Sequence, residues 1–174
     1  DGNEIGAAND LHLIGCAYRD LKRYDEAVGS FQEARALYKS NKEVIHVARC
    51  DQKIASCYVE LSNGDAALES ARKALDVFET AHDHLRETFA LFEYGKAQVL
   101  LGKLEEGLDS LDTVLQTATE EDPKDFEFIV DIESRMAAVM RTLGRDKEAD
   151  EIERRLASVR DAMIEDTNNE EERA

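Results

Sequence analysis

Small residues recur along this chain at a spacing of about 40 positions, and this period constrains the fold more than any other feature. One series steps by 40, 40 and 42 positions: Gly15, Ala55, Gly95 and Ala137. A second series keeps the same steps: Ala27, Ala67, Gly107 and Ala149. Two independent series with one period indicate four structural repeats rather than a chance pattern.

Each repeat is predicted to be a pair of α-helices, so the fold class is all-α. Apolar residues such as Leu11, Ile14 and Tyr18 are spaced by three and four positions, which is the period of a helix. The small residues allow two helix backbones to approach closely. Gly102 and Gly144 are expected to end helices in the left-handed conformation. The predicted helices span residues 4–21, 24–39, 43–61, 65–81, 84–101, 104–119, 123–143 and 146–165.

Two helix starts have recognisable capping residues. Ser40 and Glu43 have the spacing of a capping box. Asp122 precedes Pro123, the only proline, which is tolerated in a first helical turn because its missing N–H has no partner there. We therefore expect helices to begin just after Ser40 and Asp122.

The charge balance excludes several classes of partner. The chain has 174 residues, with 22 basic and 39 acidic side chains and a net charge of −17. Such a chain repels phosphate, so we expect no direct nucleic-acid binding and no binding to anionic membranes. No apolar run reaches the length that spans a bilayer. Three cysteines do not form a disulfide framework, and Cys16, Cys50 and Cys57 are expected to be buried or half-buried thiols in a reducing, cytoplasmic setting.

No constellation in the sequence favours catalysis. His82 and His84 flank Asp83, but no cysteine is near in sequence, so a zinc site is not expected. The nine glycines are scattered and form no phosphate-binding loop. We therefore predict a protein that is not an enzyme and that needs no metal and no cofactor.

The first repeat resembles the tetratricopeptide repeat family through Leu11, Ile14, Gly15, Tyr18, Ala27, Phe31 and Ala34. The usual repeat has about 34 residues, so repeats of about 40 resemble the long-helix branch that includes kinesin light chains. The resemblance implies a right-handed superhelical solenoid of four antiparallel helix pairs over residues 1–165, followed by a disordered acidic tail, 166–174. The four units would span about 4–41, 42–82, 83–122 and 123–165.

The family resemblance also implies a concave groove, lined by the first helix of each pair, that binds a peptide or a partner helix. Projected on this geometry, the sequence gives twelve candidate partner-binding residues: Asn9, His12, Cys16, Arg19, Arg49, Gln52, Ser56, Phe89, Phe92, Lys96, Val99 and Arg141. The predicted groove is less acidic than the rest of the chain, which favours an acidic ligand. Phe89, Phe92, Val99 and Leu100 would form an apolar patch that receives an apolar anchor.

Two other interpretations of these residues stay open at this stage. Phe89 and Phe92 could pack on the helix at 65–81 or under the acidic tail, and the basic residues could form pairs within the chain. The function predicted is a protein–protein interaction scaffold. The alternative is a peptide-sensing or docking domain of a larger, bacterial regulator, since the chain begins without Met. The first helix has no preceding helix to cover it, so a second copy covering it would give a homodimer.

Overall fold

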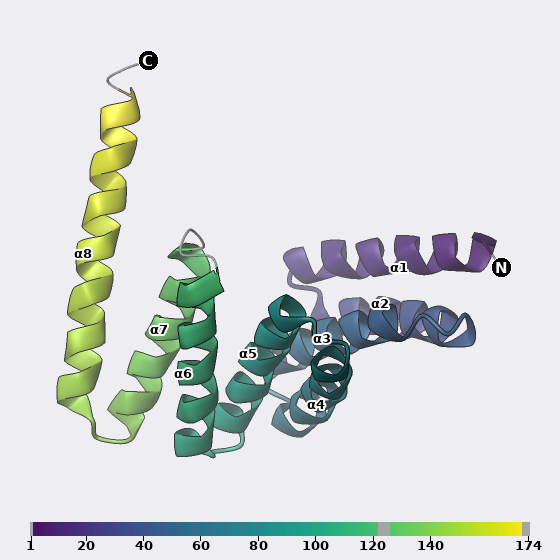
Figure 1. Cartoon of the computed structure of the whole chain (residues 1–174), viewed down its shortest axis with the longest axis horizontal. Coiled ribbons are helices and arrows are strands. Elements are labelled where there is room, and N and C mark those ends of the chain that lie inside the picture. The colour runs from purple at the N-terminus through teal and green to yellow at the C-terminus, as the bar shows by residue number, and fades with distance from the viewer. Residues whose placement is uncertain (1, 122–125, 172–174) are drawn as a thin grey trace. The chain divides into compact units, whose positions relative to one another are not determined.

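The computed structural model describes residues 2–121 and 126–171, and the side chains of 3–120 and 126–158 (Figure 1). In this part of the chain there are eight α-helices and no strand, which confirms the all-α class. The helices are α1 (Gly2–Asp20), α2 (Tyr24–Ser40), α3 (Val44–Glu60), α4 (Gly64–Thr80), α5 (His84–Leu100), α6 (Leu104–Glu121), α7 (Phe126–Thr142) and α8 (Asp146–Glu171). None of these helices is long and apolar enough to cross a membrane.

The chain divides into two compact units, Asp1–Val114 and Leu115–Ala174, and each is described by itself. In the first unit α1 packs on α2, α2 on α3, α3 on α4 and α4 on α5, and α3 also contacts α5. In the second unit α7 packs on α8. Successive antiparallel helices therefore form a helical-repeat fold, as the period predicted. The single domain over 1–165 and its four units stay a prediction.

The first six helices begin and end within two residues of the predicted bounds. The end of the chain differs, because α8 continues to Glu171, six residues beyond the predicted end at 165. The predicted disordered segment 166–174 therefore begins too early, and 172–174 lie outside the described residues. The predicted cap at Asp122 and Pro123 also lies outside them.

Small residues lie where helices cross, as the two series predicted. Ala27, Ala55, Ala67 and Ala149 have no exposed surface. A Cβ atom added at Gly107 of α6 would lie 2.6 Å from a methyl group of Val99 on α5. Larger side chains at these positions would force the helices apart, which explains why the period is kept in small residues.

The joints between helices repeat every 20 residues. Residues in the left-handed conformation are Lys22, Lys42, Ser62, His82, Gly102 and Gly144, with φ between 54° and 76°. At each joint the same two backbone hydrogen bonds form, as from Lys22 N to Arg19 O and from Arg23 N to Tyr18 O. This is the Schellman motif. The two glycines were predicted in this role, and the four other residues were not.

The predicted capping box at Ser40 is wrong. Residue Glu43 precedes α3 and makes no side-chain capping bond, while the Ser40 hydroxyl donates to the carbonyl of Leu37 inside α2. Side-chain caps occur instead at Asn63, which accepts from Ala66 N, and at Asp83. The Schellman turn fixes the chain path at Ser40, so no side-chain cap is required there.

Candidate functional site

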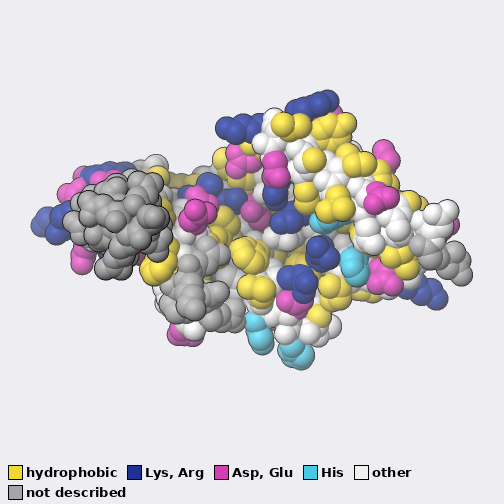
Figure 2. Space-filling model, turned by 90° about the horizontal axis from the view of Figure 1, so that it is seen from above, with side chains coloured by type: hydrophobic (Ala, Val, Ile, Leu, Met, Phe, Trp, Pro, Cys, Tyr) yellow, Lys and Arg dark blue, Asp and Glu magenta, His cyan; other side chains and the backbone are white. Residues whose placement is uncertain are grey.

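Three cations from α1 and α3 surround the same part of the first unit. We name Arg19, Arg49 and Lys53 the basic cluster. Each of the three lowers the pKa of His12, which places their charges around one point. Burial, followed by the charge of Arg19, lowers the pKa of Lys53 itself. Figure 2 shows Lys and Arg side chains (dark blue) next to His side chains (cyan) in the middle of one face of the molecule.

Two members of the basic cluster form no close ion pair, although the carboxylate of Glu93 acts on Lys53 from a longer distance. Among the described residues, Arg49 and Lys53 form no ion pair and no side-chain hydrogen bond, although both are partly buried. Arg19 pairs with its neighbour Asp20 at 3.0 Å, which confirms the open interpretation that basic residues form pairs within the chain. Partly buried cations without a close ion-pair partner favour an external anionic group over solvent alone.

His12 lies behind the basic cluster and belongs to the core rather than to its surface. It is 8% exposed, its ring meets Phe31 edge-on at 5.2 Å, and its Nδ1 lies 3.7 Å from Sγ of Cys50. Burial, reinforced by the nearby cations, lowers the pKa of His12 to about 4. The imidazole is therefore neutral at pH 7 and adds no charge to the cluster.

The other predicted residues of α1 and α3 are mostly engaged inside the unit. Asn9 accepts a hydrogen bond from the hydroxyl of Tyr38 at 2.6 Å. The free thiol of Cys16 is half-buried and packs against the core cluster that contains Phe31. Gln52 is 9% exposed, and Ser56 is half-buried. The role of these residues in binding a partner stays a prediction.

The apolar patch predicted on α5 does not form as an exposed surface, because Phe92 is only 5% exposed. The ammonium group of Lys96 lies 4.5 Å from the centre of the Phe92 ring and 2.7 Å from the carboxylate of Glu93. Lys96 and Glu93 are themselves buried, so α5 contributes a neutral pair here. Phe89 and Val99 are half-buried, and Leu100 is 43% exposed.

Arg141 lies in the second unit and pairs most closely with two carboxylates of α8, while that of Asp146 lies farther away at 3.5 Å. Its guanidinium lies 2.5 Å from Asp150 and 2.8 Å from Glu153, and these hydrogen bonds raise its pKa. An anionic ligand would have to compete with both carboxylates. The contact of Arg141 with a partner stays a prediction.

Lys53 was missed by the sequence reasoning. The equivalent positions in the repeats before and after it, 40 residues away, are Leu13 and Glu93. Neither of these residues indicates a cation at this position of the repeat. Its adjacency to Gln52 was the available signal, because two neighbouring helical positions can both contribute to a broad face. The structure thus adds Lys53 of α3 to the basic residues that the sequence predicted, and it pairs Lys96 of α5 with Glu93.

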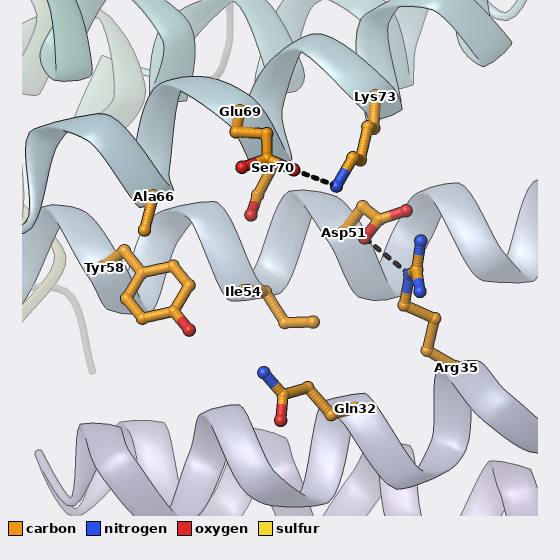
Figure 3. A pocket seen from close by; sticks show the side chains of 9 residues that line it. All are labelled: Gln32, Arg35, Asp51, Ile54, Tyr58, Ala66, Glu69, Ser70 and Lys73. Atoms are coloured by element: carbon orange, nitrogen blue, oxygen red, sulfur yellow. Dashed lines mark hydrogen bonds and ion pairs between the residues drawn. The ribbon is translucent and has the colours of Figure 1, made fainter.

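A polar cleft of about 240 Å³ lies elsewhere in the first unit, between α2, α3 and α4 (Figure 3). Arg35 lies 2.7 Å from Asp51, and Lys73 lies 2.5 Å from Glu69, so each cation in the cleft has its own carboxylate. Figure 3 shows Ile54 of α3 beside these pairs and Tyr58 of the same helix farther along the cleft, near Ala66. The cleft has no net charge, and it differs in this respect from the basic cluster.

Metal ligation has no support in the described part of the chain. No group of three or more His, Cys, Asp or Glu residues lies close enough there to hold an ion. Burial raises the pKa of Cys50 to about 12 and that of Cys57 to about 11, so both thiols stay protonated at neutral pH. Thiolate chemistry is therefore not favoured at these two positions.

The helix pairs and their small-residue contacts define a helical-repeat protein. A family model of the tetratricopeptide repeat matches residues 8–41, the segment whose residues carry the resemblance. The resemblance to this family is confirmed, and residues 8–41 form one such repeat. A search of curated protein sequences gives no significant match.

Solved structures with the same fold include relatives of the long-repeat type. BtubC (BKLC) from P. vanneervenii has a TM-score of 0.77 at 17% identity, over 90% of this chain and 64% of that chain. A putative kinesin light chain from Podosopora anserina, with nearly identical TPR-like repeats, has a TM-score of 0.73 at 14% identity, over 88% and 75%. This chain therefore spans less than two thirds of the length of BtubC.

One similar structure contains a bound peptide. The first TPR of Spaghetti (RPAP3), bound to the HSP90 peptide SRMEEVD, has a TM-score of 0.59 at 22% identity, over 80% of this chain and 94% of that chain. Three of the seven residues in that peptide are acidic. At this level of identity the likeness shows the fold, and the peptide belongs to that protein.

Proposed function

We propose that this protein is a protein–protein interaction scaffold that binds an acidic segment of a partner at the basic cluster of α1 and α3. The observation that carries the proposal is the pair Arg49 and Lys53, which are partly buried and form no close ion pair with any described residue in a chain of net charge −17. Carboxylates are the natural ligands of partly buried cations of this kind. The acidic peptide bound by the RPAP3 repeat domain supports this class of ligand.

The protein surface that could contact an apolar anchor of the ligand is smaller than the sequence analysis predicted. Phe92 is buried, so an anchor would contact Phe89, Val99 and Leu100 at the edge of α5. We retain the anchor in the proposal because Leu100 is exposed at the end of α5, where the neighbouring Val99 is half-buried. The acidic residues of the ligand supply its specificity for the basic cluster.

The test is a titration with a defined probe. A labelled synthetic peptide with Glu and Asp residues flanking one Leu is titrated into the full chain and into the Arg49→Glu/Lys53→Glu variant. We expect the variant to bind the peptide at least about tenfold more weakly, which corresponds to roughly 1.4 kcal/mol. The matched control, Lys39→Glu/Lys103→Glu, makes the same change of charge at exposed positions outside the basic cluster.

The control decides between a site and general electrostatics. Affinity should stay within about twofold in the control variant, because distant surface charges are screened by salt. Equal losses in both variants, or no loss in the Arg49→Glu/Lys53→Glu variant, would remove the basic cluster as the binding site. Circular dichroism of each variant checks that the helices are intact.

The remaining predictions belong to the same proposal. An absence of catalytic activity agrees with the fold, and the cytoplasmic location stays a prediction. The alternative function, a docking domain within a larger bacterial regulator, is decided by the full reading frame: an adjoining output or DNA-binding domain would support it. The basic cluster would serve as the sensing site in that case also.

A further inference from the structure

The polar cleft between α2, α3 and α4 is a second candidate binding site, separate from the basic cluster. Ile54 and Tyr58 of α3 line it together with Gln32 of α2 and Ser70 of α4. Figure 3 shows these four side chains around one open space, with the hydroxyl groups of Tyr58 and Ser70 directed into it. The space therefore offers both apolar and hydrogen-bonding surface to a ligand.

The two hydroxyl groups in the polar cleft are not engaged by the protein itself. Ser70 is only 9% exposed, and Tyr58 is half-buried. Neither side chain forms a hydrogen bond with any residue that the structure describes. Polar groups that are partly withdrawn from solvent without a partner cost free energy. A ligand that hydrogen-bonds both hydroxyl groups would recover this loss.

The following repeat shows which side chain belongs at this position. Forty residues after Gln32 and Ile54 come Arg72 of α4 and Tyr94 of α5. The guanidinium of Arg72 lies 5.0 Å from the centre of the Tyr94 ring and donates a hydrogen bond at 2.7 Å to its hydroxyl. In that repeat an arginine thus lies over the helix equivalent to α3.

A second contact of the following repeat also has no counterpart in the polar cleft. Forty residues after Tyr58 and Ser70 come Gln98 and Ser110, and the hydroxyl of Ser110 donates to Oε1 of Gln98 at 2.7 Å. Tyr58 and Ser70 make no such hydrogen bond with each other or with another described residue. The polar cleft therefore lacks both contacts that the next repeat makes at the equivalent positions.

Two carboxylates lie beside the open space and can accept hydrogen bonds from a cation. Asp51 is buried and pairs with Arg35 at 2.7 Å, whereas Glu69 pairs with Lys73 at 2.5 Å. The side chains of Lys73 and Glu69 are 49% and 69% exposed, so solvent weakens this pair and Glu69 can exchange Lys73 for another cation. The net charge of −17 favours a basic ligand over an acidic one here.

We propose that the polar cleft binds an arginine side chain from a basic segment of a partner protein. The apolar stem of this arginine packs on Ile54, and its guanidinium donates to the hydroxyl groups of Tyr58 and Ser70 and to the carboxylate of Glu69. A lysine fits less well, because its ammonium group has three donors and no planar fork. The proposal is independent of the acidic ligand of the basic cluster.

The test is a titration with three blocked peptides that differ in one side chain. The first carries a single arginine among glycine and serine residues, and the others carry citrulline, a neutral side chain of similar shape, or lysine in its place. Binding to the full chain at about 0.15 M NaCl is followed by the NMR shifts of the backbone amides. We expect the citrulline peptide to bind at least about tenfold more weakly and the lysine peptide about threefold more weakly.

Two variants at exposed residues identify the site. Gln32→Arg gives the polar cleft the arginine of the next repeat, so the protein's own guanidinium should compete and weaken the arginine peptide at least about fivefold. Glu69→Gln removes the charged acceptor and should weaken it by a similar factor. The matched control is Glu79→Gln, the same change at an exposed residue of α4 that does not line the cleft, and its affinity should stay within about twofold.

Four results would overturn the proposal. The first two are equal affinity of the arginine and citrulline peptides and undiminished binding to the Gln32→Arg protein. The third is an equal loss in Glu69→Gln and Glu79→Gln, which would indicate general attraction to an acidic chain. The fourth is tighter binding of free arginine than of the peptide, which would assign the cleft to an amino acid instead of a partner protein. Circular dichroism checks that the helices are intact in each variant.

Discussion

His12 is kept neutral by the cations that form the basic cluster. It is buried against Phe31 and Cys50, with Arg49 and Lys53 close enough to act on its charge. Protonating it inside the fold would therefore oppose both burial and repulsion. A histidine that had been predicted to contact a ligand becomes a residue that makes folding sensitive to acid.

We expect a measurable loss of stability between pH 7.5 and pH 5 that depends on His12. Its pKa is about 4 in the fold, below the usual 6.5, so the unfolded chain binds more protons in this range. Stability that is present above pH 6.5 is lost as the pH falls toward 4. This group contributes a loss of about 2 kcal/mol at pH 5.

Urea unfolding of the unaltered chain and of His12→Gln at both pH values measures the effect. The difference in stability between the two proteins should be smaller at pH 5, because glutamine does not titrate. The same pH dependence in both proteins would contradict the assignment.

The site was predicted only in part because side-chain burial depends on neighbouring helices. The repeat predicted a binding face on α1 and α3 that includes Arg49, and this face stays a prediction. Phe92 and Lys96 are buried together with Glu93. Their burial depends on how neighbouring helices pack, which the spacing of residues within one helix does not predict. For Lys53 the sequence offered only its adjacency to Gln52, and the charges around His12 in the fold place it with Arg19 and Arg49.

At the scale of the element, one turn joins every pair of successive helices whose joint the structure describes. Four of these turns place a residue other than glycine at positive φ: Lys22, Lys42, Ser62 and His82. A side chain in this conformation costs about 1 kcal/mol relative to glycine. The chain therefore retains strain at most of its joints.

We expect Ser62→Gly to stabilise the first unit by about 1 kcal/mol and Gly102→Ala to destabilise it by a similar amount. Both residues adopt positive φ, 56° for Ser62 and 76° for Gly102, in the same Schellman turn. Gly29→Ala is the matched control, because Gly29 lies inside α2 with open space around it. Helix propensity makes that change stabilising by roughly 0.5–1 kcal/mol.

Chemical denaturation of the three variants gives the comparison. If Gly102→Ala were as stabilising as Gly29→Ala, the turn would not require glycine.

The bounds of the first six helices were predictable within two residues because helix length and period are local properties of the sequence. The end of α8 was not, because its polar, acidic sequence has no apolar period that marks where the helix stops.

At the scale of the whole molecule, the dominant property is a net charge of −17. Such a charge opposes a compact fold through self-repulsion and repels other acidic molecules at long range. The basic cluster is an exception to this excess of negative charge, and it consists of only three side chains. Its attraction for an acidic segment has to overcome the field of the whole chain.

Salt should therefore change stability and binding in opposite directions. Between about 10 mM and about 0.3 M NaCl we expect the midpoint of thermal unfolding to rise, because screening weakens the repulsion within the chain. Over the same range the affinity for the acidic peptide should fall, because the contacts with Arg49 and Lys53 are screened. Differential scanning fluorimetry and peptide titration measure the two trends, and a salt-independent affinity would contradict charge recognition.

The uniform joints have a consequence for how such a protein can change its length. Since the turn at Lys42 and the turn at His82 are the same, the segment 43–82 begins and ends on identical connections. A gene duplication of these 40 codons would add one complete helix pair and leave the flanking helices in register. Proteins of this type can thus gain or lose recognition surface in whole helix pairs, because the existing turns connect the added pair to its neighbours.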